Sequence, residues 1–182
     1  MPSLFLCAMK AKHVILFILL LMPVFIYVFL KMFGKNTYEI PIYYSEGVNS
    51  DYCGLLTTVP YTLDVDRITL FYAHSAKNEH IQTILREMVR IKSKTDIRII
   101  GLEDLNEEKI PDVAGVSYVG MLPNELVDFM SCKILVYSES SDVYNYLVLV
   151  DINGAIRGYY NAGDFAEYDR LFAEIDILQT IR

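Results

Sequence analysis

Residues 146–160, YLVLVDINGAIRGYY, decide the fold of this chain. Two runs rich in β-branched and aromatic residues, 146–150 and 155–160, flank a short connection that contains Asn153 and Gly154. Asn followed by Gly is typical of a tight turn, because both residues accept the positive φ angles that such turns need. We therefore predict a β-hairpin here, with its turn at this dipeptide.

A helix is predicted to follow the hairpin. Asp164 can cap its first turn, since a carboxylate accepts hydrogen bonds from the free N–H groups there. Apolar residues then recur at intervals of three and four, which indicates one buried helix face. These residues are Phe165, Tyr168, Leu171, Phe172, Ile175 and Leu178.

Shorter apolar runs before the hairpin predict the rest of a sheet. Residues 68–72, 97–100 and 133–137 are expected to be strands, and Pro123 to open a short helix. The predicted fold class is α/β, a thioredoxin-like mixed sheet flanked by helices. Another helix of this domain is indicated by Ile81, Ile84, Leu85, Met88 and Ile91.

Charge excludes nucleic acid as a partner. From Asn36 onward the chain carries 12 Lys and Arg against 23 Asp and Glu, and no basic stripe offers a footprint for a phosphate backbone. Several carboxylates are clustered, but their spacing does not match a calcium-binding loop, so we interpret them as a solvated acidic surface. These carboxylates are Asp64, Asp66, Glu103, Asp104, Glu107 and Glu108.

The N-terminal segment is predicted to be a transmembrane helix. From Val14 to Leu30 no charged residue interrupts the apolar run, and about 17 residues at about 1.5 Å each nearly match a hydrocarbon core of roughly 30 Å. Pro23 lies mid-span, where membrane helices tolerate it. A cleaved signal peptide would end in a small-x-small site, which residues 30–33 do not provide.

Four regions are expected along the chain. The count of flanking lysines is equal on the two sides of the apolar run, so the positive-inside rule does not orient it. The regions are a short tail at 1–12, the transmembrane helix at 13–33, an extended spacer at 34–58 and the thioredoxin-like domain at 59–182.

Residues 149–160, LVDINGAIRGYY, resemble the Sco/SenC family of membrane-anchored, thioredoxin-like copper proteins. The resemblance continues through residues 164–178 and includes the anchor and the Ile40-Pro41 spacer. It implies a copper chaperone or thiol-disulfide reductase that helps assemble cytochrome c oxidase outside an energy-transducing membrane. With the short N-terminal tail, it places the anchor in the bacterial inner membrane, with a cytoplasmic N-terminus and a periplasmic domain.

The residues that carry the family's chemistry are replaced in this chain. The family site uses Cys-x-x-x-Cys just after the first core strand and a distant His. Counting along this sequence places the cysteines at Ser75 and Glu79 and the histidine at Val143. Cu(I) prefers soft thiolate ligands, and a disulfide is attacked only by a thiolate. Neither copper of the family type nor any other cofactor is expected there.

Two other residue sets remain candidates for a functional site. His74, Glu79 and His80 lie at a strand-to-helix transition, and imidazole with carboxylate can bind Zn(II) or Cu(II), although their spacing does not place them on one helix face. Cys53 and Cys132 can pair in an oxidising compartment. They define a thiol-disulfide alternative, but they lack the Cys-x-x-Cys spacing that lowers a thiol pKa.

The sequence is interpreted as a membrane-tethered, Sco-like protein without the copper and redox site. We expect a noncatalytic accessory or assembly subunit rather than an enzyme. Its expected partners are the bilayer and other membrane proteins, with a respiratory complex as the setting that the resemblance implies. The metal-binding and thiol-disulfide alternatives stay open at this point, because side-chain distances decide between them.

Overall fold

The computed structural model describes residues 3–33, 39–50, 53–136 and 143–180. The chain forms two compact units, Met1–Glu39 and Ile40–Arg182. The second unit therefore begins inside the predicted spacer, and Ile40 is already buried in its core.

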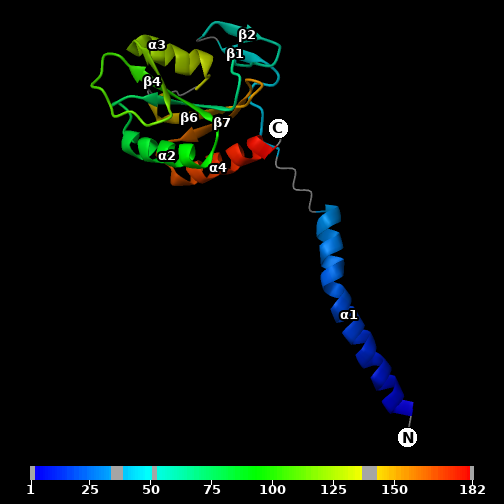
Figure 1. The fold of residues 1–182 in the computed structure, drawn as a ribbon. Helices are drawn as coiled ribbons and strands as arrows, with labels where there is room; N and C mark the ends of the chain where they lie inside the picture. Colours follow the sequence, from blue (N-terminus) through cyan, green and yellow to red (C-terminus); the bar gives the residue numbers. More distant parts are fainter. Residues whose placement is uncertain (1–2, 34–38, 51–52, 137–142, 181–182) are drawn as a thin grey trace. The chain divides into compact units, whose positions relative to one another are not determined.

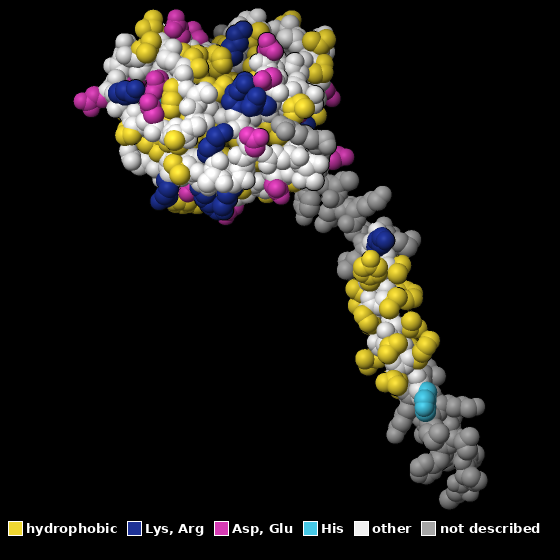
Figure 2. Space-filling model, in the orientation of Figure 1, with side chains coloured by type: hydrophobic (Ala, Val, Ile, Leu, Met, Phe, Trp, Pro, Cys, Tyr) yellow, Lys and Arg dark blue, Asp and Glu magenta, His cyan; other side chains and the backbone are white. Residues whose placement is uncertain are grey.

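The first unit contains one helix, α1 (Ser3–Phe33), with Pro23 inside it. Its described side chains between Ile15 and Phe29 are mostly apolar and exposed, as Figure 2 shows. The side chains of Val14 and Leu30, the predicted ends of the anchor, lie outside the described residues.

The predicted transmembrane helix and its location need correction. No helix in the described part of the chain has the length and apolar character that crossing a membrane requires. The prediction of a single-pass protein of the bacterial inner membrane, with a cytoplasmic N-terminus and a periplasmic domain, is therefore wrong.

The second unit is built on a five-stranded mixed sheet in the order β5-β4-β3-β6-β7. The central strand β3 (Thr69–His74) pairs in parallel with β4 (Arg98–Asp104), which pairs in parallel with β5 (Ser117–Met121). On its other side β3 pairs antiparallel with β6 (Tyr146–Val150), which forms a hairpin with β7 (Ile156–Asn161). A parallel strand-helix-strand half joined to an antiparallel hairpin is the thioredoxin-like arrangement that the sequence predicts.

Helices cover both faces of this sheet. The helices α2 (Ile81–Lys94) and α4 (Phe165–Thr180) lie on one face, and the short helix α3 (Pro123–Asp128) lies on the other (Figure 1). Alternate residues of a strand point to opposite faces, so Leu70 and Tyr72 join the core under α2 and α4, whereas Phe71 and Ala73 join the core under α3.

Two short helical turns and a two-stranded ribbon complete the domain. A π-helical turn, η1 (Phe129–Lys133), continues α3 directly, and a 3-10 turn, η2 (Val143–Asn145), precedes β6. A small antiparallel ribbon of β1 (Val48–Ser50) and β2 (Leu55–Thr57) stands apart from the main sheet. This ribbon also lies within the predicted spacer.

The predicted hairpin is confirmed, and the Asp151 side chain takes part in its turn as well as the Asn153-Gly154 dipeptide. Asp151 Oδ1 accepts hydrogen bonds from the backbone N–H groups of Asn153 at 2.8 Å and Ala155 at 3.0 Å. Gly154 takes a φ of +80°. The turn is thus closed by the Asp151 side chain as well as by the glycine.

Two local predictions differ from the structure. The expected strand at 133–137 is wrong in its described part, because Leu135 has a φ of +59°, a left-handed conformation that interrupts extended chain; Tyr137 lies outside the described residues. Phe165 was expected in the buried face of α4 but is exposed, since it stands at the first residue of the helix. Its ring lies instead near the Arg86 guanidinium.

Candidate functional site

The turn between β3 and α2 begins with a buried serine. Ser75 stands where the resemblance places the first copper-binding cysteine, and its hydroxyl donates a 2.8 Å hydrogen bond to Glu107 Oε2. The backbone N–H of Ala76 donates to the same oxygen at 2.6 Å. Glu107 therefore holds this turn from the loop that follows β4.

Lys77 joins the turn to the same loop. Its ammonium lies 3.0 Å from Asp104 Oδ2 and 3.1 Å from Glu107 Oε1. These hydrogen bonds raise the pKa of Lys77. Burial raises the pKa of Asp104, but the Asn106 N–H and the Lys77 ammonium lower it more, so its pKa lies below the ordinary value. Asp104 is buried and ion-paired, which corrects its interpretation as solvated surface.

Asn78 fixes the far end of the turn. It is buried, its side-chain amide donates to the carbonyl of Tyr144, and its Oδ1 accepts from the His80 backbone N–H at 2.8 Å. Glu79, the second cysteine-equivalent position, is exposed, and Val143 is buried in η2. A hydroxyl, a carboxylate and an isopropyl group supply no soft ligand, so these residues do not fit Cu(I).

The structure does not bring His74, Glu79 and His80 together. His80 stands at the start of α2, and its ring packs against Gly163, where a Cβ would lie 2.6 Å from His80 Nε2. His74 ends β3 and points to the neighbouring strand β4. Within the described chain, the set of potential metal ligands that does converge is His74, Glu103 and Asp112.

These three residues meet at the C-terminal ends of two parallel strands. The register pairs His74 on β3 with Glu103 on β4, so both side chains project on the same face. Asp112 comes from the loop between β4 and β5. One ligand atom from each of the three residues lies within 4.8 Å of the others.

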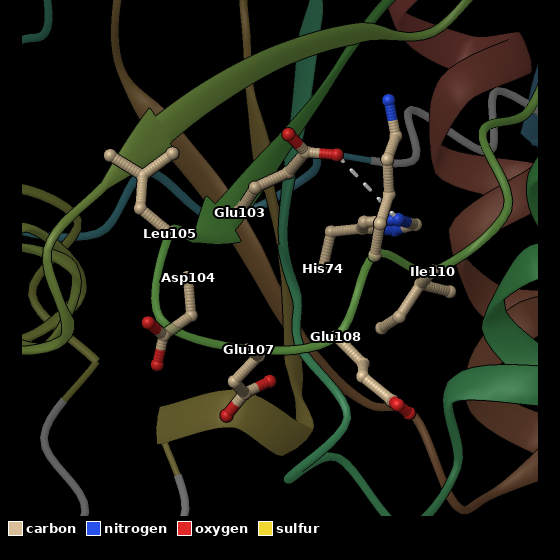
Figure 3. A pocket seen from close by; sticks show the side chains of 8 residues that line it. His74, Glu103, Asp104, Leu105, Glu107, Glu108 and Ile110 are labelled. Carbon is tan, nitrogen blue, oxygen red and sulfur yellow. Dashed lines mark ion pairs between the residues drawn. The ribbon is translucent and has the colours of Figure 1, made fainter.

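A shallow cavity of about 170 Å³ opens beside this cluster. In Figure 3 the Glu103 carboxylate turns toward the His74 ring, whereas Glu108 points away from it. The cavity is lined by His74, Glu103, Asp104, Leu105, Glu107, Glu108, Lys109 and Ile110.

His74 is the buried member of the cluster. Its side chain is 1% exposed, and Nε2 lies 3.9 Å from Glu103 Oε1 but has no hydrogen-bond partner. Burial lowers the pKa of His74, and this effect outweighs the opposing influence of the Ile110 backbone and of the Glu103 and Asp112 carboxylates. The ring is therefore held neutral in an acidic setting.

A row of residues across three strands supports the His74 ring. The register aligns Tyr72, Gly101 and Tyr118, and a Cβ on Gly101 would lie 2.8 Å from the Tyr118 ring and 3.0 Å from the Tyr72 hydroxyl. Glycine thus allows the two tyrosines to meet. The Tyr72 hydroxyl lies 3.2 Å from His74 Nδ1, and burial followed by the Tyr118 hydrogen bond raises the pKa of Tyr72, which keeps it protonated.

Sequence reasoning identified His74 but missed its partners. Glu103 was grouped with surface carboxylates, and Asp112 was not singled out. One signal was available: parallel strands end at the same sheet edge, so polar residues at the ends of 68–74 and 97–104 are neighbours. That signal requires the strand order, which the sequence does not state.

Cys53 and Cys132 form a disulfide, with an S–S distance of 2.01 Å and Cα atoms 5.4 Å apart. It ties the turn between β1 and β2 to the π-helical turn η1. Both cysteines are half-buried. The disulfide therefore joins elements other than the turn that begins at Ser75.

Three solved structures are similar to part of this chain. A SCO1/SenC family lipoprotein from Bacillus anthracis str. Ames is 12% identical with a TM-score of 0.45, over 63% of this chain and 82% of that one. BsSco, a member of the Sco family of cytochrome c oxidase assembly proteins, is 15% identical with a TM-score of 0.47, over 64% and 83%. Trgpx in its apo form is 13% identical with a TM-score of 0.41, over 61% and 82%.

Two of these three proteins are members of the family that residues 149–160 resemble. No protein-family model and no curated protein sequence matches the chain. The thioredoxin-like fold rests on the strand order and directions described above.

Proposed function

We propose that this chain is a Sco-related, thioredoxin-like protein that performs neither copper transfer through thiolates nor thiol exchange, and acts as a noncatalytic accessory subunit in respiratory-complex assembly. One observation carries the proposal. At the position of the family's Cys-x-x-x-Cys, the turn contains Ser75 and Glu79 and is held by hydrogen bonds and ion pairs within the chain. Such a turn is a structural element rather than a reactive one.

The disulfide alternative has weaker support. Disulfide exchange needs an attacking thiolate near the bond. The sequence contains three cysteines, of which Cys53 and Cys132 are bonded to each other, so the domain supplies no further thiol as a resolving partner. We assign the bond a stabilising role.

A partner contact is supported by one edge of the sheet. β5 is an edge strand, and unpaired strand edges readily accept another chain. Val119 on this strand is 41% exposed, Leu122, which follows the strand, is 49% exposed, and Leu105, whose side chain lies over Gly120, is 62% exposed. We name these three residues the β5 patch. A subunit of a respiratory complex is the occupant that the family resemblance favours.

The chemical half of the proposal is tested by restoring the missing ligands. The wild-type chain is expected to retain no Cu(I) in competition with a chromophoric chelator and to reduce no disulfide substrate. The matched variant Ser75→Cys/Glu79→Cys/Val143→His should gain Cu(I) binding, which shows that the fold can support the site. Retention of stoichiometric Cu(I) by the wild-type chain would contradict the proposal.

The partner half is tested in cells that contain a respiratory chain. Tagged wild-type chain should co-purify a respiratory-complex subunit identified by mass spectrometry, and Leu105→Lys/Val119→Lys should abolish this recovery. Leu56→Lys is the matched control, because Leu56 is 77% exposed on β2, outside the β5 patch. Recovery of the chain without any such subunit, in repeated purifications, would refute the accessory role.

A further inference from the structure

His74 presents an unsatisfied nitrogen to two carboxylates. Its side chain is 1% exposed, and Nε2 has no hydrogen-bond partner. A buried polar atom without a partner costs free energy, so such atoms are rare in folded proteins. Glu103 Oε1 lies 3.9 Å from Nε2, and one ligand atom each of His74, Glu103 and Asp112 lies within 4.8 Å of the others, which marks this cluster as a place for a positively charged ligand.

The hydrogen bonds around Tyr72 are compatible with a proton on either nitrogen of the His74 ring, and one arrangement of them leaves Nε2 unprotonated. The Val113 backbone N–H donates to the Tyr118 hydroxyl at 2.6 Å, and the Tyr72 hydroxyl donates toward the same oxygen at 3.5 Å. The Tyr72 oxygen is then free to accept from His74 Nδ1 at 3.2 Å. In this assignment Nδ1 carries the hydrogen and Nε2 carries a lone pair directed at the carboxylates.

A lone pair facing carboxylate oxygens is repulsive unless a cation lies between them. A shared proton does not account for the arrangement, because the 3.9 Å between Nε2 and Glu103 Oε1 exceeds hydrogen-bond length. Lys109 does not fill this role either. Its ammonium lies 3.5 Å from Asp112 Oδ2, and the side chain is 77% exposed.

We propose that His74, Glu103 and Asp112 bind a divalent transition-metal ion of the zinc class, through His74 Nε2 and one oxygen of each carboxylate. One nitrogen and two oxygen ligands from protein, with an open fourth position, suit Zn(II). An imidazole ligand disfavours Mg(II) and Ca(II), and the lack of thiolate disfavours Cu(I). The ligands of this site are not Ser75 or Glu79, although His74 adjoins Ser75 in the chain, and the site does not depend on the proposed accessory role.

The ligand atoms, which lie within 4.8 Å of one another, must draw closer together to hold the ion. Tetrahedral zinc with bonds of about 2.0–2.1 Å places its ligand atoms about 3.3 Å apart, against the 3.9 Å between Nε2 and Glu103 Oε1. His74 is fixed by its burial and by Tyr72, whereas Asp112 is half-exposed in a loop. The carboxylates are thus the ligands that move, and the hydrogen bond between Nδ1 and the Tyr72 hydroxyl holds the orientation of the ring.

The test measures Zn(II) binding to the full chain by isothermal titration and by metal analysis after dialysis. We expect one ion per chain, and at least tenfold weaker binding for Asp112→Asn and for Glu103→Gln. Glu108→Gln is the matched control: it lines the same cavity and removes the same charge, but its carboxylate points away from His74 (Figure 3). It should bind Zn(II) as the wild type does, and millimolar Mg(II) should not compete.

A second readout reports on the histidine itself. In a full chain labelled with ¹⁵N, Zn(II) should shift the Nε2 resonance of His74 and leave that of His80 unchanged. Tyr72→Phe should weaken binding about tenfold, since loss of an outer-shell partner has typically cost 10–100-fold. Because the carboxylate variants keep the buried ring, they test the site even if replacements of His74 fail to fold.

Three results would overturn the proposal. They are the absence of stoichiometric Zn(II), equal binding by wild type, Asp112→Asn and Glu103→Gln, and a ¹⁵N spectrum in which His74 does not respond. Partner recovery through the β5 patch is measured without added metal, so failure of the accessory role and failure of this site are distinguishable.

Discussion

At the scale of single residues, Gly154 shows why the hairpin turn needs glycine. Its φ is +80°, and a Cβ there would lie 1.9 Å from the carbonyl oxygen of Leu63. Leu63 also donates its backbone N–H to the Gly154 carbonyl at 2.8 Å. The segment that leads to β3 is therefore attached to the hairpin turn through backbone atoms that cannot move aside cheaply.

Replacement of this glycine should cost considerable stability. We expect Gly154→Ala to lower the free energy of unfolding by about 2–4 kcal/mol, through positive φ and the contact with Leu63. Gly54→Ala is the control, since Gly54 has a φ of +61° but open space around its Cβ position. This variant should lose about 1 kcal/mol of unfolding free energy. Urea unfolding followed by circular dichroism measures both, and equal losses would show that the contact with Leu63 is unimportant.

Gly101 offers a test at the binding site. A methyl group there would press against the Tyr118 ring and the Tyr72 hydroxyl, which support His74. Gly101→Ala is expected to displace the tyrosines and weaken Zn(II) binding about tenfold, in the range of lost outer-shell partners. Titration calorimetry measures the change. Unaltered affinity in a folded Gly101→Ala protein would mean that the tyrosine row does not orient the ring.

At the scale of elements, the disulfide determines how firmly the β1-β2 ribbon is held. The bond joins residues 79 positions apart, and closing so long a loop restricts the unfolded chain. We expect Cys53→Ala/Cys132→Ala to lose about 2–4 kcal/mol of unfolding free energy. Denaturation with and without a reductant measures this loss. The reductant should destabilise the wild type and leave the variant unchanged, and the opposite pattern would contradict a stabilising bond.

Elements with strong periodicity were predictable from the sequence. The hairpin, β3, β4, α2 and α4 all follow from apolar spacing, since burial imposes that spacing. β5 was missed, because an edge strand whose residues are largely exposed has no buried face to mark it. The reversal at Leu135 was missed as well, since its positive φ is imposed by tertiary packing rather than by residue type.

The candidate site was only half predictable. The replacement of the copper ligands at Ser75, Glu79 and Val143 can be read directly, because it concerns residue identity. The convergence of His74, Glu103 and Asp112 cannot, because it depends on strand register and on the path of a loop. His80 is close to His74 in the sequence, but its ring packs against Gly163.

At the scale of the whole molecule, metal binding should stabilise the domain as a unit. A ligand that binds only the folded state, at a hundred times its Kd, adds about 2.7 kcal/mol to the free energy of unfolding. Zn(II) should therefore raise the Tm of the wild type and of Glu108→Gln, and EDTA should reverse the rise. Differential scanning calorimetry measures both, and an equal rise in Asp112→Asn would place the ion elsewhere.

The disulfide also has a mechanical consequence. Covalent closure between Cys53 and Cys132 encloses β2, β3, α2, β4, β5 and α3 in a ring and leaves β1, β6, β7 and α4 outside it. When the two ends of the domain are pulled apart, the disulfide carries the force past the residues between Cys53 and Cys132, so that segment is not extended. A single-molecule stretching record should therefore fall short of the fully reduced length by about 270 Å, at roughly 3.4 Å per enclosed residue.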